Sequence, residues 1–160
     1  MMSAINYIGN RTCIKFKEDA NAEQRVQLNA APMNGCSSKI GAPGTSATMR
    51  GESVLKFGNC AFMGNMVHEL SHALGSIHEH NRPDRDDKLT VDAAEVKRRG
   101  LEADMNPDAW GATKIYVPFD YGSVMLYDVY RYGEKIMTPK EPKYERTMGN
   151  RRVGFYDIQK

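Results

Sequence analysis

The chain has 160 residues, of which 41% are hydrophobic and 26% are charged, and its formal net charge is +2. A chain of this length can bury a core and is expected to form one domain, residues 1–160. No apolar run is long enough to cross a bilayer, and the near-balance of charge predicts neither a nucleic-acid nor a membrane partner. The oligomeric state cannot be read from these properties.

Several short segments before the histidine-rich part of the chain have the alternation or β-branched content of strands. The predicted strands are Cys13–Lys17, Arg25–Asn29, Ala47–Arg50 and Ser53–Phe57. Turn-forming residues separate them, and the chain after the histidines contains few regular elements. The predicted fold class is therefore α+β, with a sheet that precedes a helix.

All four histidines fall within the segment from His68 to His80. His68 and His72 are four residues apart, a spacing that places two side chains on one face of a helix, about 5–6 Å apart at Cβ. The apolar residues around them also recur at helical spacing. Two imidazoles arranged in this way can bind one zinc ion, with Zn–N distances of about 2.0–2.1 Å.

His78 cannot reach the same ion if the helix continues, because six further residues would carry it about 9 Å along the axis. Gly75 lies where the chain must turn back, and glycine adopts the left-handed conformation that ends helices at little steric cost. The sequence therefore predicts a helix that supplies two ligands, a stop at Gly75, and a return segment that supplies the third. His80 fits no ligand position and is expected to lie beside the site or on the surface.

Three protein ligands leave one position of a tetrahedral zinc ion open, which is typical of a catalytic rather than a structural site. Glu69 follows the first ligand, and a carboxylate there can take a proton from water and return it to a leaving amine. The whole pattern, H-E-x-x-H-x-x-G-x-x-H, is a zinc-peptidase motif. We expect one Zn²⁺ per chain on His68, His72 and His78.

The acidic residues after the histidines imitate part of a calcium loop, at Asp84, Asp86, Asp92 and Glu95. Leu89 stands where that loop requires glycine, so a calcium site is not expected. We expect these acids to hold the segment after His78 in place through ion pairs with arginines such as Arg82 and Arg85. Asp92 and Glu95 also form a capping pair, which predicts a short helix that ends before Gly100.

The segment from His68 to Asp86 resembles the extended zinc signature of astacins, a branch of the metzincin endopeptidases. The residues that carry this resemblance beyond the histidines are Glu79, Arg82, Asp84, Arg85 and Asp86. Tyr121–Tyr127 resembles the Met-turn of the family, and Asp157-Ile158 resembles a segment near its C-terminal helix. Leu126 and Ser76 depart from residues that are common in the family, but neither departure removes a ligand.

The resemblance implies a metzincin-like fold, in which an N-terminal lobe (residues 1–75) and a C-terminal lobe (residues 76–160) flank a cleft. It implies that Met125 forms an apolar floor beneath the imidazoles and that Tyr127 donates a hydrogen bond to the developing oxyanion. It also implies a protein or peptide substrate, bound as an extended strand near Cys36–Ser38. In astacins the mature amino terminus is buried near the glutamate that corresponds to Glu79.

Cys36 and Cys60 match a disulfide of the family, and Cys13 matches a cysteine whose partner has no counterpart here. With this pattern we expect a secreted protein truncated at both ends, although the chain shows no signal peptide. Three reduced thiols in an intracellular protein are the alternative. The leading hypothesis is a zinc endopeptidase, and the second is a truncated, inactive protein that still binds zinc.

Overall fold

The computed structural model describes residues 1–29, 36–41, 51–57, 62–107, 113–131 and 133–160. The chain divides into two compact units, Met1–Ser76 and Ile77–Lys160. No helix in the described ranges has the length and hydropathy needed to span a membrane. The predicted strand Ala47–Arg50 lies outside the described residues.

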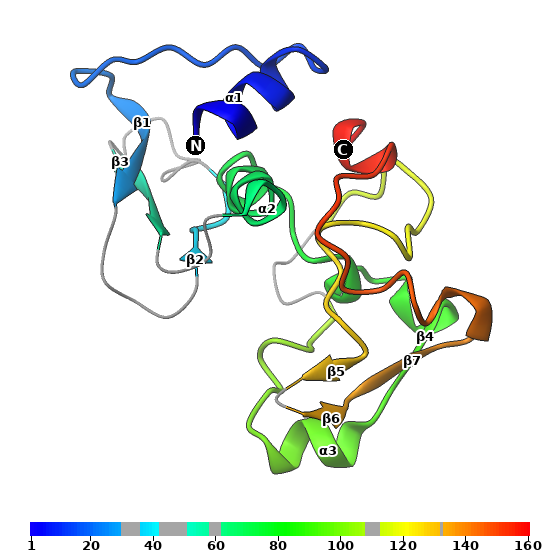
Figure 1. Cartoon of the computed structure of the whole chain (residues 1–160). Helices are drawn as coiled ribbons and strands as arrows, with labels where there is room; N and C mark the ends of the chain where they lie inside the picture. Colours follow the sequence, from blue (N-terminus) through cyan, green and yellow to red (C-terminus); the bar gives the residue numbers. More distant parts are fainter. Residues whose placement is uncertain (30–35, 42–50, 58–61, 108–112, 132) are drawn as a thin grey trace. The chain divides into compact units, whose positions relative to one another are not determined.

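The described residues of the first unit form a three-stranded sheet and two helices (Figure 1). β1 (Gln24–Asn29) pairs in parallel with β3 (Gly51–Phe57), and β2 (Cys36–Ser37) pairs antiparallel with the other side of β3. The prediction of strands at Arg25–Asn29 and Ser53–Phe57 is therefore confirmed. Among the described strands, β2 lies at an edge of this sheet, in the order β1-β3-β2.

The predicted strand at Cys13–Lys17 is wrong, because these residues are irregular. Side-chain alternation alone does not make a strand, which also needs a partner for its backbone groups. Among the described residues, this segment pairs with no strand.

Two helices pack together in the first unit, α1 (Met2–Gly9) and α2 (Met63–Ala73). Ala4 and Ile8 of α1 are buried, as are Val67 and Leu70 of α2. Removing these apolar side chains from water stabilises α2 in its place, at roughly 25 cal/mol per Å² of buried area. The opposite faces of α2 carry the polar residues of the histidine motif.

The second unit contains short helices and two-stranded ladders around a separate apolar core. α3 (Ala93–Arg98) has the predicted cap, since the Asp92 carboxylate accepts a hydrogen bond of 2.9 Å from the Glu95 N–H. β4 (Leu89–Val91) pairs with β7 (Met137–Pro139), and β5 (Tyr130–Arg131) pairs with β6 (Glu134–Lys135). The single-turn 3-10 helices are η1 (Glu79–Asn81), η2 (Arg85–Asp87), η3 (Pro142–Tyr144) and η4 (Tyr156–Ile158).

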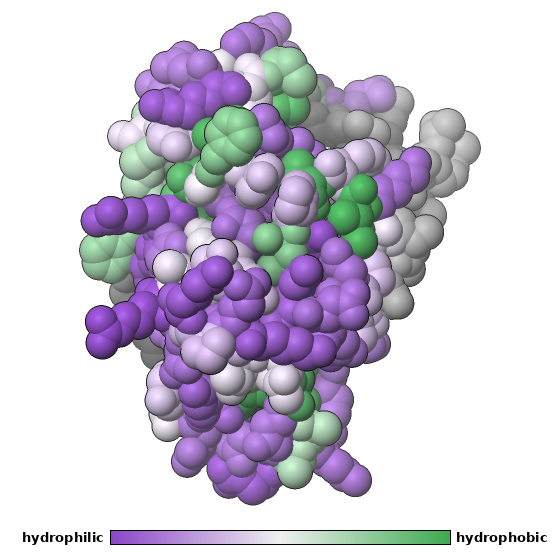
Figure 2. All heavy atoms as spheres, turned by 90° about the vertical axis from the view of Figure 1, so that its right-hand side faces the viewer, coloured by the Kyte–Doolittle hydropathy of each residue, from purple (hydrophilic) through white to green (hydrophobic). Residues whose placement is uncertain are grey.

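Hydrophilic side chains predominate on the face of the molecule in Figure 2, with hydrophobic side chains scattered among them. Some large apolar side chains are nevertheless exposed in the second unit, including Tyr116 and Phe155. Isolated exposed side chains of this kind are normal on protein surfaces.

Gly149 is a position in the second unit where any side chain would collide with the backbone. Its φ is +70°, and an added Cβ would lie 2.6 Å from the Cα of Asp128. Gly100 has a similar φ of +66°, but an added Cβ would have no neighbour within 4 Å. An added side chain would therefore meet conformational strain alone at Gly100, but both strain and steric collision at Gly149.

We predict that Gly149→Ala destabilises the protein more than Gly100→Ala. The left-handed conformation should cost about 1–2 kcal/mol at either position, and the collision should add about 1–3 kcal/mol at Gly149. Urea unfolding followed by circular dichroism would measure both free energies. Equal losses of unfolding free energy in the two variants would contradict the predicted collision at Gly149.

Candidate metal centre

α2 presents the first two histidines of the motif on one helical face, as their spacing predicts. The ring centroids of His68 and His72 are 4.6 Å apart, and the rings meet edge to face at 89°. Val67 and Leu70, on the buried side of the helix, are 2% and 1% exposed. The packed face therefore fixes the direction in which both imidazoles point.

The helix ends where the sequence predicts, with Gly75 at a φ of +105°. The Gly75 N–H donates to the His72 carbonyl (2.9 Å), and the Ser76 N–H donates to the Ser71 carbonyl (2.9 Å). These two bonds form a Schellman motif, which satisfies the last carbonyls of a helix and turns the chain back. His78 follows in extended conformation, with φ −65° and ψ 145°.

The three histidines are positioned to bind one zinc ion. One ring nitrogen from each of His68, His72 and His78 lies within 4.8 Å of the others. Tetrahedral Zn–N bonds of about 2.0–2.1 Å would draw these atoms closer together as an ion binds. Three neutral imidazoles suit zinc and leave an open coordination position, so the donor set fits a catalytic ion.

The ring of His72 has the orientation and charge that a metal ligand needs. Its Nδ1 lies 2.8 Å from the Ser76 carbonyl oxygen, which can only accept, so Nδ1 carries the proton and Nε2 keeps its lone pair. Burial, together with the nearby His68 ring, lowers the pKa of His72 to about 4, although the Ser76 bond opposes this. The imidazole is therefore neutral at pH 7.

Glu69 is buried beside the first ligand, with only 7% of its surface exposed. Burial raises the pKa of this carboxyl to about 7, because the charged form loses its hydration. A carboxyl with a pKa near neutrality can both accept and release a proton under physiological conditions.

Glu79, the residue after the third histidine, has a buried carboxylate that accepts hydrogen bonds from three donors. It accepts from the Asp120 N–H (2.9 Å), from Nη1 of Arg82 (3.0 Å) and from Nζ of Lys160 (2.6 Å). Its own N–H donates to the Met125 carbonyl (2.9 Å). Since Glu79 is only 2% exposed, these donors replace the water that its charge has lost.

The predicted arginine–aspartate pairs are present. Arg82 binds Asp84 through two parallel hydrogen bonds of 2.8 and 2.9 Å, and this contact holds the pKa of Asp84 below its usual value. Arg85 binds Asp86 (2.8 Å) and also donates to the His80 carbonyl (2.9 Å). Both arginines are buried, so the pairs hold the segment after His78 in a fixed conformation.

The Met-turn segment is a tight turn in which the Leu126 N–H donates to the Ser123 carbonyl (3.1 Å). Met125 is 1% exposed. The carboxylate of Asp157 supports the turn, since it accepts from the Ser123 hydroxyl and from the Val124 N–H (3.0 Å). The Met125 carbonyl thereby meets the Glu79 N–H and ties this turn to the segment of the third histidine.

Tyr127 follows that turn and lies against His78, with ring centroids 4.5 Å apart. His80 is completely buried beside both rings, so the alternative of a surface position for His80 is wrong. Sequence reasoning did not find Lys160 or Arg131, which contact Glu79 and Tyr127 respectively. A buried carboxylate implies some counter-charge, but no spacing in the sequence identifies which lysine supplies it.

Comparison with known proteins identifies the family. The model of the family described as Astacin, a family of peptidases, matches residues 1–160. The chain belongs to the astacin family. It is 46% identical over 158 residues to zinc metalloproteinase nas-24 of Caenorhabditis elegans, covering 99% of this chain and 38% of that protein. The chain thus spans less than half the length of this curated relative.

Two solved structures have the same fold as this astacin-family chain. High choriolytic enzyme 1, a hatching enzyme zinc-protease from the medaka fish Oryzias latipes, matches with a TM-score of 0.75 and 26% identity. That match covers 99% of this chain and 76% of the solved one. Myroilysin matches in fold with a TM-score of 0.62 and 21% identity, covering 98% of this chain and 80% of its own. The predicted metzincin-like α+β fold is therefore confirmed.

Lys160 lies between two buried carboxylates and should contribute to stability through them. Its Nζ is 2.6 Å from Glu79 and 3.4 Å from Asp157, whose side chains are 2% and 1% exposed. We predict that Lys160→Gln destabilises the protein by about 3 kcal/mol, because it removes the cation that Glu79 and Asp157 share and so leaves part of their buried negative charge uncompensated. Urea unfolding would measure the loss.

Lys160→Arg should retain most of this stability, since it keeps the charge. Lys140→Gln, at an exposed lysine, is the matched control and should have little effect. Identical unfolding midpoints for Lys160→Gln and Lys140→Gln would show that the buried pairs contribute nothing.

Proposed function

We propose that this chain is a zinc-dependent endopeptidase that hydrolyses peptide bonds in proteins. The observation that carries the proposal is the convergence of three imidazole nitrogens within 4.8 Å, next to a buried glutamate in the H-E-x-x-H-x-x-G-x-x-H motif. The names of the relatives, which include several zinc metalloproteinases, support the same class of reaction.

His68, His72 and His78 would hold the ion. When bound, zinc would acidify a water molecule and polarise the carbonyl of the bond to be cleaved. The Nδ1–H of His72, held by the Ser76 carbonyl, would leave the other nitrogen of that ring as the one that binds the ion. By the astacin resemblance, Met125 would form the apolar floor beneath the three rings.

Glu69 would act as the general base and then as the general acid. One oxygen of its carboxylate would take a proton from the attacking water and later donate it to the nitrogen of the leaving amine. Its burial supports this role, because a carboxyl with a pKa of about 7 is a stronger base toward water than an ordinary glutamate and can still release its proton to the amine near neutral pH.

Tyr127 would donate a hydrogen bond from its hydroxyl to the carbonyl oxygen as negative charge develops there. A donor aimed at the oxyanion stabilises the transition state more than the ground state. The closeness of its ring to His78, at 4.5 Å, is consistent with a position near the metal.

The substrate would bind as an extended peptide along a sheet edge. β2 is an edge strand of the first unit, in the region where the astacin resemblance expects the substrate. Backbone groups at such an edge can pair with an added strand whatever its side chains are. This mode of binding suits a protease that acts within polypeptides.

The proposed activity is tested by Glu69→Gln, which keeps the shape of the side chain but removes its base. We predict that kcat for a fluorogenic peptide falls by about 10²–10⁴, while one zinc ion per chain is still bound. A zinc competition titration would measure the binding. Glu102→Gln, at an exposed glutamate, should leave both quantities unchanged.

Removal of zinc with a chelator should abolish hydrolysis, and added zinc should restore it. Zinc binding without hydrolysis in the parent chain would contradict the endopeptidase and favour a protein that only binds the metal. Full activity of Glu69→Gln would exclude Glu69 as the base.

We also propose that the protein is secreted and that Cys36 pairs with Cys60. Cys60 lies outside the described residues, so this pair rests on the astacin resemblance. Cys13 is a free and exposed cysteine. A disulfide persists in the oxidising secretory route and is rare in the cytosol.

We predict that protein produced through an oxidising compartment yields a linked Cys36–Cys60 peptide in a non-reducing digest analysed by mass spectrometry. In the intact protein, iodoacetamide should then label Cys13 alone. Labelling of all three cysteines would indicate reduced thiols and would contradict the proposed pair.

A further inference from the structure

Three aromatic rings of the second unit contact one another beside the third histidine. The rings of His78 and His80 are stacked, with centroids 4.9 Å apart and an angle of 16°. The Tyr127 ring completes the triangle, 4.2 Å from His80 and 4.5 Å from His78. His80 therefore touches both a metal-binding ring and the ring of the proposed oxyanion donor.

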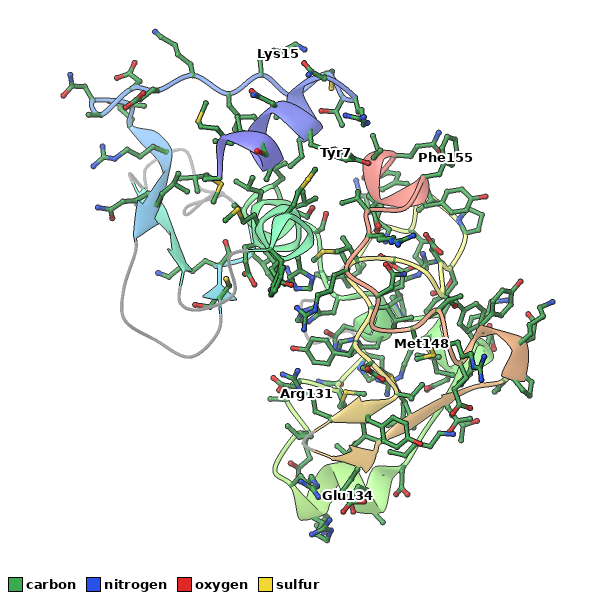
Figure 3. The ribbon with its side chains drawn as sticks, viewed as in Figure 1. Tyr7, Lys15, Arg131, Glu134, Met148 and Phe155 are labelled. Atoms are coloured by element: carbon green, nitrogen blue, oxygen red, sulfur yellow. The ribbon has the colours of Figure 1, made fainter. Side chains whose placement is uncertain are left out.

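Arg131 covers the face of Tyr127. Its guanidinium carbon lies 4.2 Å from the centroid of that ring, within the range of a cation–π interaction. Arg131 belongs to β5 in the second unit (Figure 3), and the antiparallel pairing with β6 fixes its backbone. The tyrosine ring is thus in contact with a cation from one segment and with imidazoles from another.

The His80 side of this cluster is rigid. His80 is completely buried, and its carbonyl accepts a hydrogen bond of 2.9 Å from the buried Arg85. The next residue, Asn81, donates through Nδ2 to the carbonyls of Asp104 (2.7 Å) and Asn106 (3.0 Å). These bonds hold η1, and with it the His80 ring, in one position against Tyr127.

We propose that His80 and Arg131 are positioning residues that hold the Tyr127 ring beside His78, with its hydroxyl aimed for catalysis. The inference rests on the proposed function of Tyr127 as oxyanion donor. Neither residue needs to touch substrate, because both act on the ring that carries the hydroxyl. A catalytic group displaced by about 1 Å can lose 10²-fold in rate, so loss of either contact lowers kcat more than it raises KM.

The experiment is a double-mutant cycle between Arg131→Leu and Tyr127→Phe on the zinc-loaded chain. Tyr127→Phe alone should lower kcat by about 10²-fold, the loss typical of an oxyanion donor. Arg131→Leu should lower kcat about tenfold with KM within about twofold, but should cause no further loss when Tyr127 is already phenylalanine. Arg146→Leu, at an exposed arginine, is the matched control.

The same factor of loss from Arg131→Leu in both backgrounds would overturn the proposal, since the arginine would then act elsewhere. An unchanged kcat in Arg131→Leu would also overturn it. If Tyr127→Phe leaves kcat unchanged while Glu69→Gln abolishes hydrolysis, the positioning role fails but the endopeptidase stands.

A readout that needs no turnover comes from fluorotyrosine labelling. The chain has 8 tyrosines, and Tyr127→Phe removes one ¹⁹F resonance and so identifies it. Arg131→Leu and His80→Leu should each shift or broaden that resonance, and Arg146→Leu should not. A Tyr127 resonance that is identical in all these variants would overturn the proposal even if the parent chain hydrolysed nothing.

Zinc affinity separates the two positioning residues. His80→Leu should weaken zinc binding by about tenfold, because the His78 ring loses its stacked neighbour. His80→Phe, which keeps a flat ring, should restore most of the affinity, and Arg131→Leu should leave it unchanged. Equal zinc affinity in His80→Leu and the parent would overturn the His80 part of the proposal.

Discussion

The metal centre depends on a reversal of the backbone directly after α2. Without it, His78 would lie about 9 Å further along the helix axis than His72. The Schellman motif at Gly75 produces the reversal with two backbone hydrogen bonds, and the same turn places the Ser76 carbonyl against Nδ1 of His72. One turn therefore ends the helix, orients the second ligand and leads to the third.

The segment that carries the third ligand is held by buried charge rather than by regular secondary structure. Glu79, adjacent to His78, accepts hydrogen bonds from Asp120, Arg82 and Lys160, which come from different parts of the second unit. A buried carboxylate is stable only when such donors replace water. The same hydrogen bonds also organise the surrounding chain, because the donors to Glu79 bring the Met-turn and η4 together around it.

The parts of the site that could be predicted from sequence are those fixed by local spacing. The i,i+4 histidines, the stop at Gly75, the Asp92 cap and the Arg82–Asp84 pair each depend on residues within a few positions of one another. Cys13–Lys17 has equally regular alternation but is no strand, because pairing depends on a distant partner. Lys160 and Glu79 are 81 positions apart, and no local rule connects them.

This division has a physical consequence for the site. The motif supplies reactive groups, but the spacing of its histidines does not remove the rotational freedom of imidazole and phenol rings. Contacts with other groups remove it: the Ser76 carbonyl, from within the motif, holds the His72 ring, and the buried His80 and the guanidinium of Arg131 contact the Tyr127 ring. Binding of an ion by three such rings costs less conformational entropy when they are already held in place. Since metal binding is coupled to folding, the residues that order the three histidine rings also contribute to the affinity for zinc.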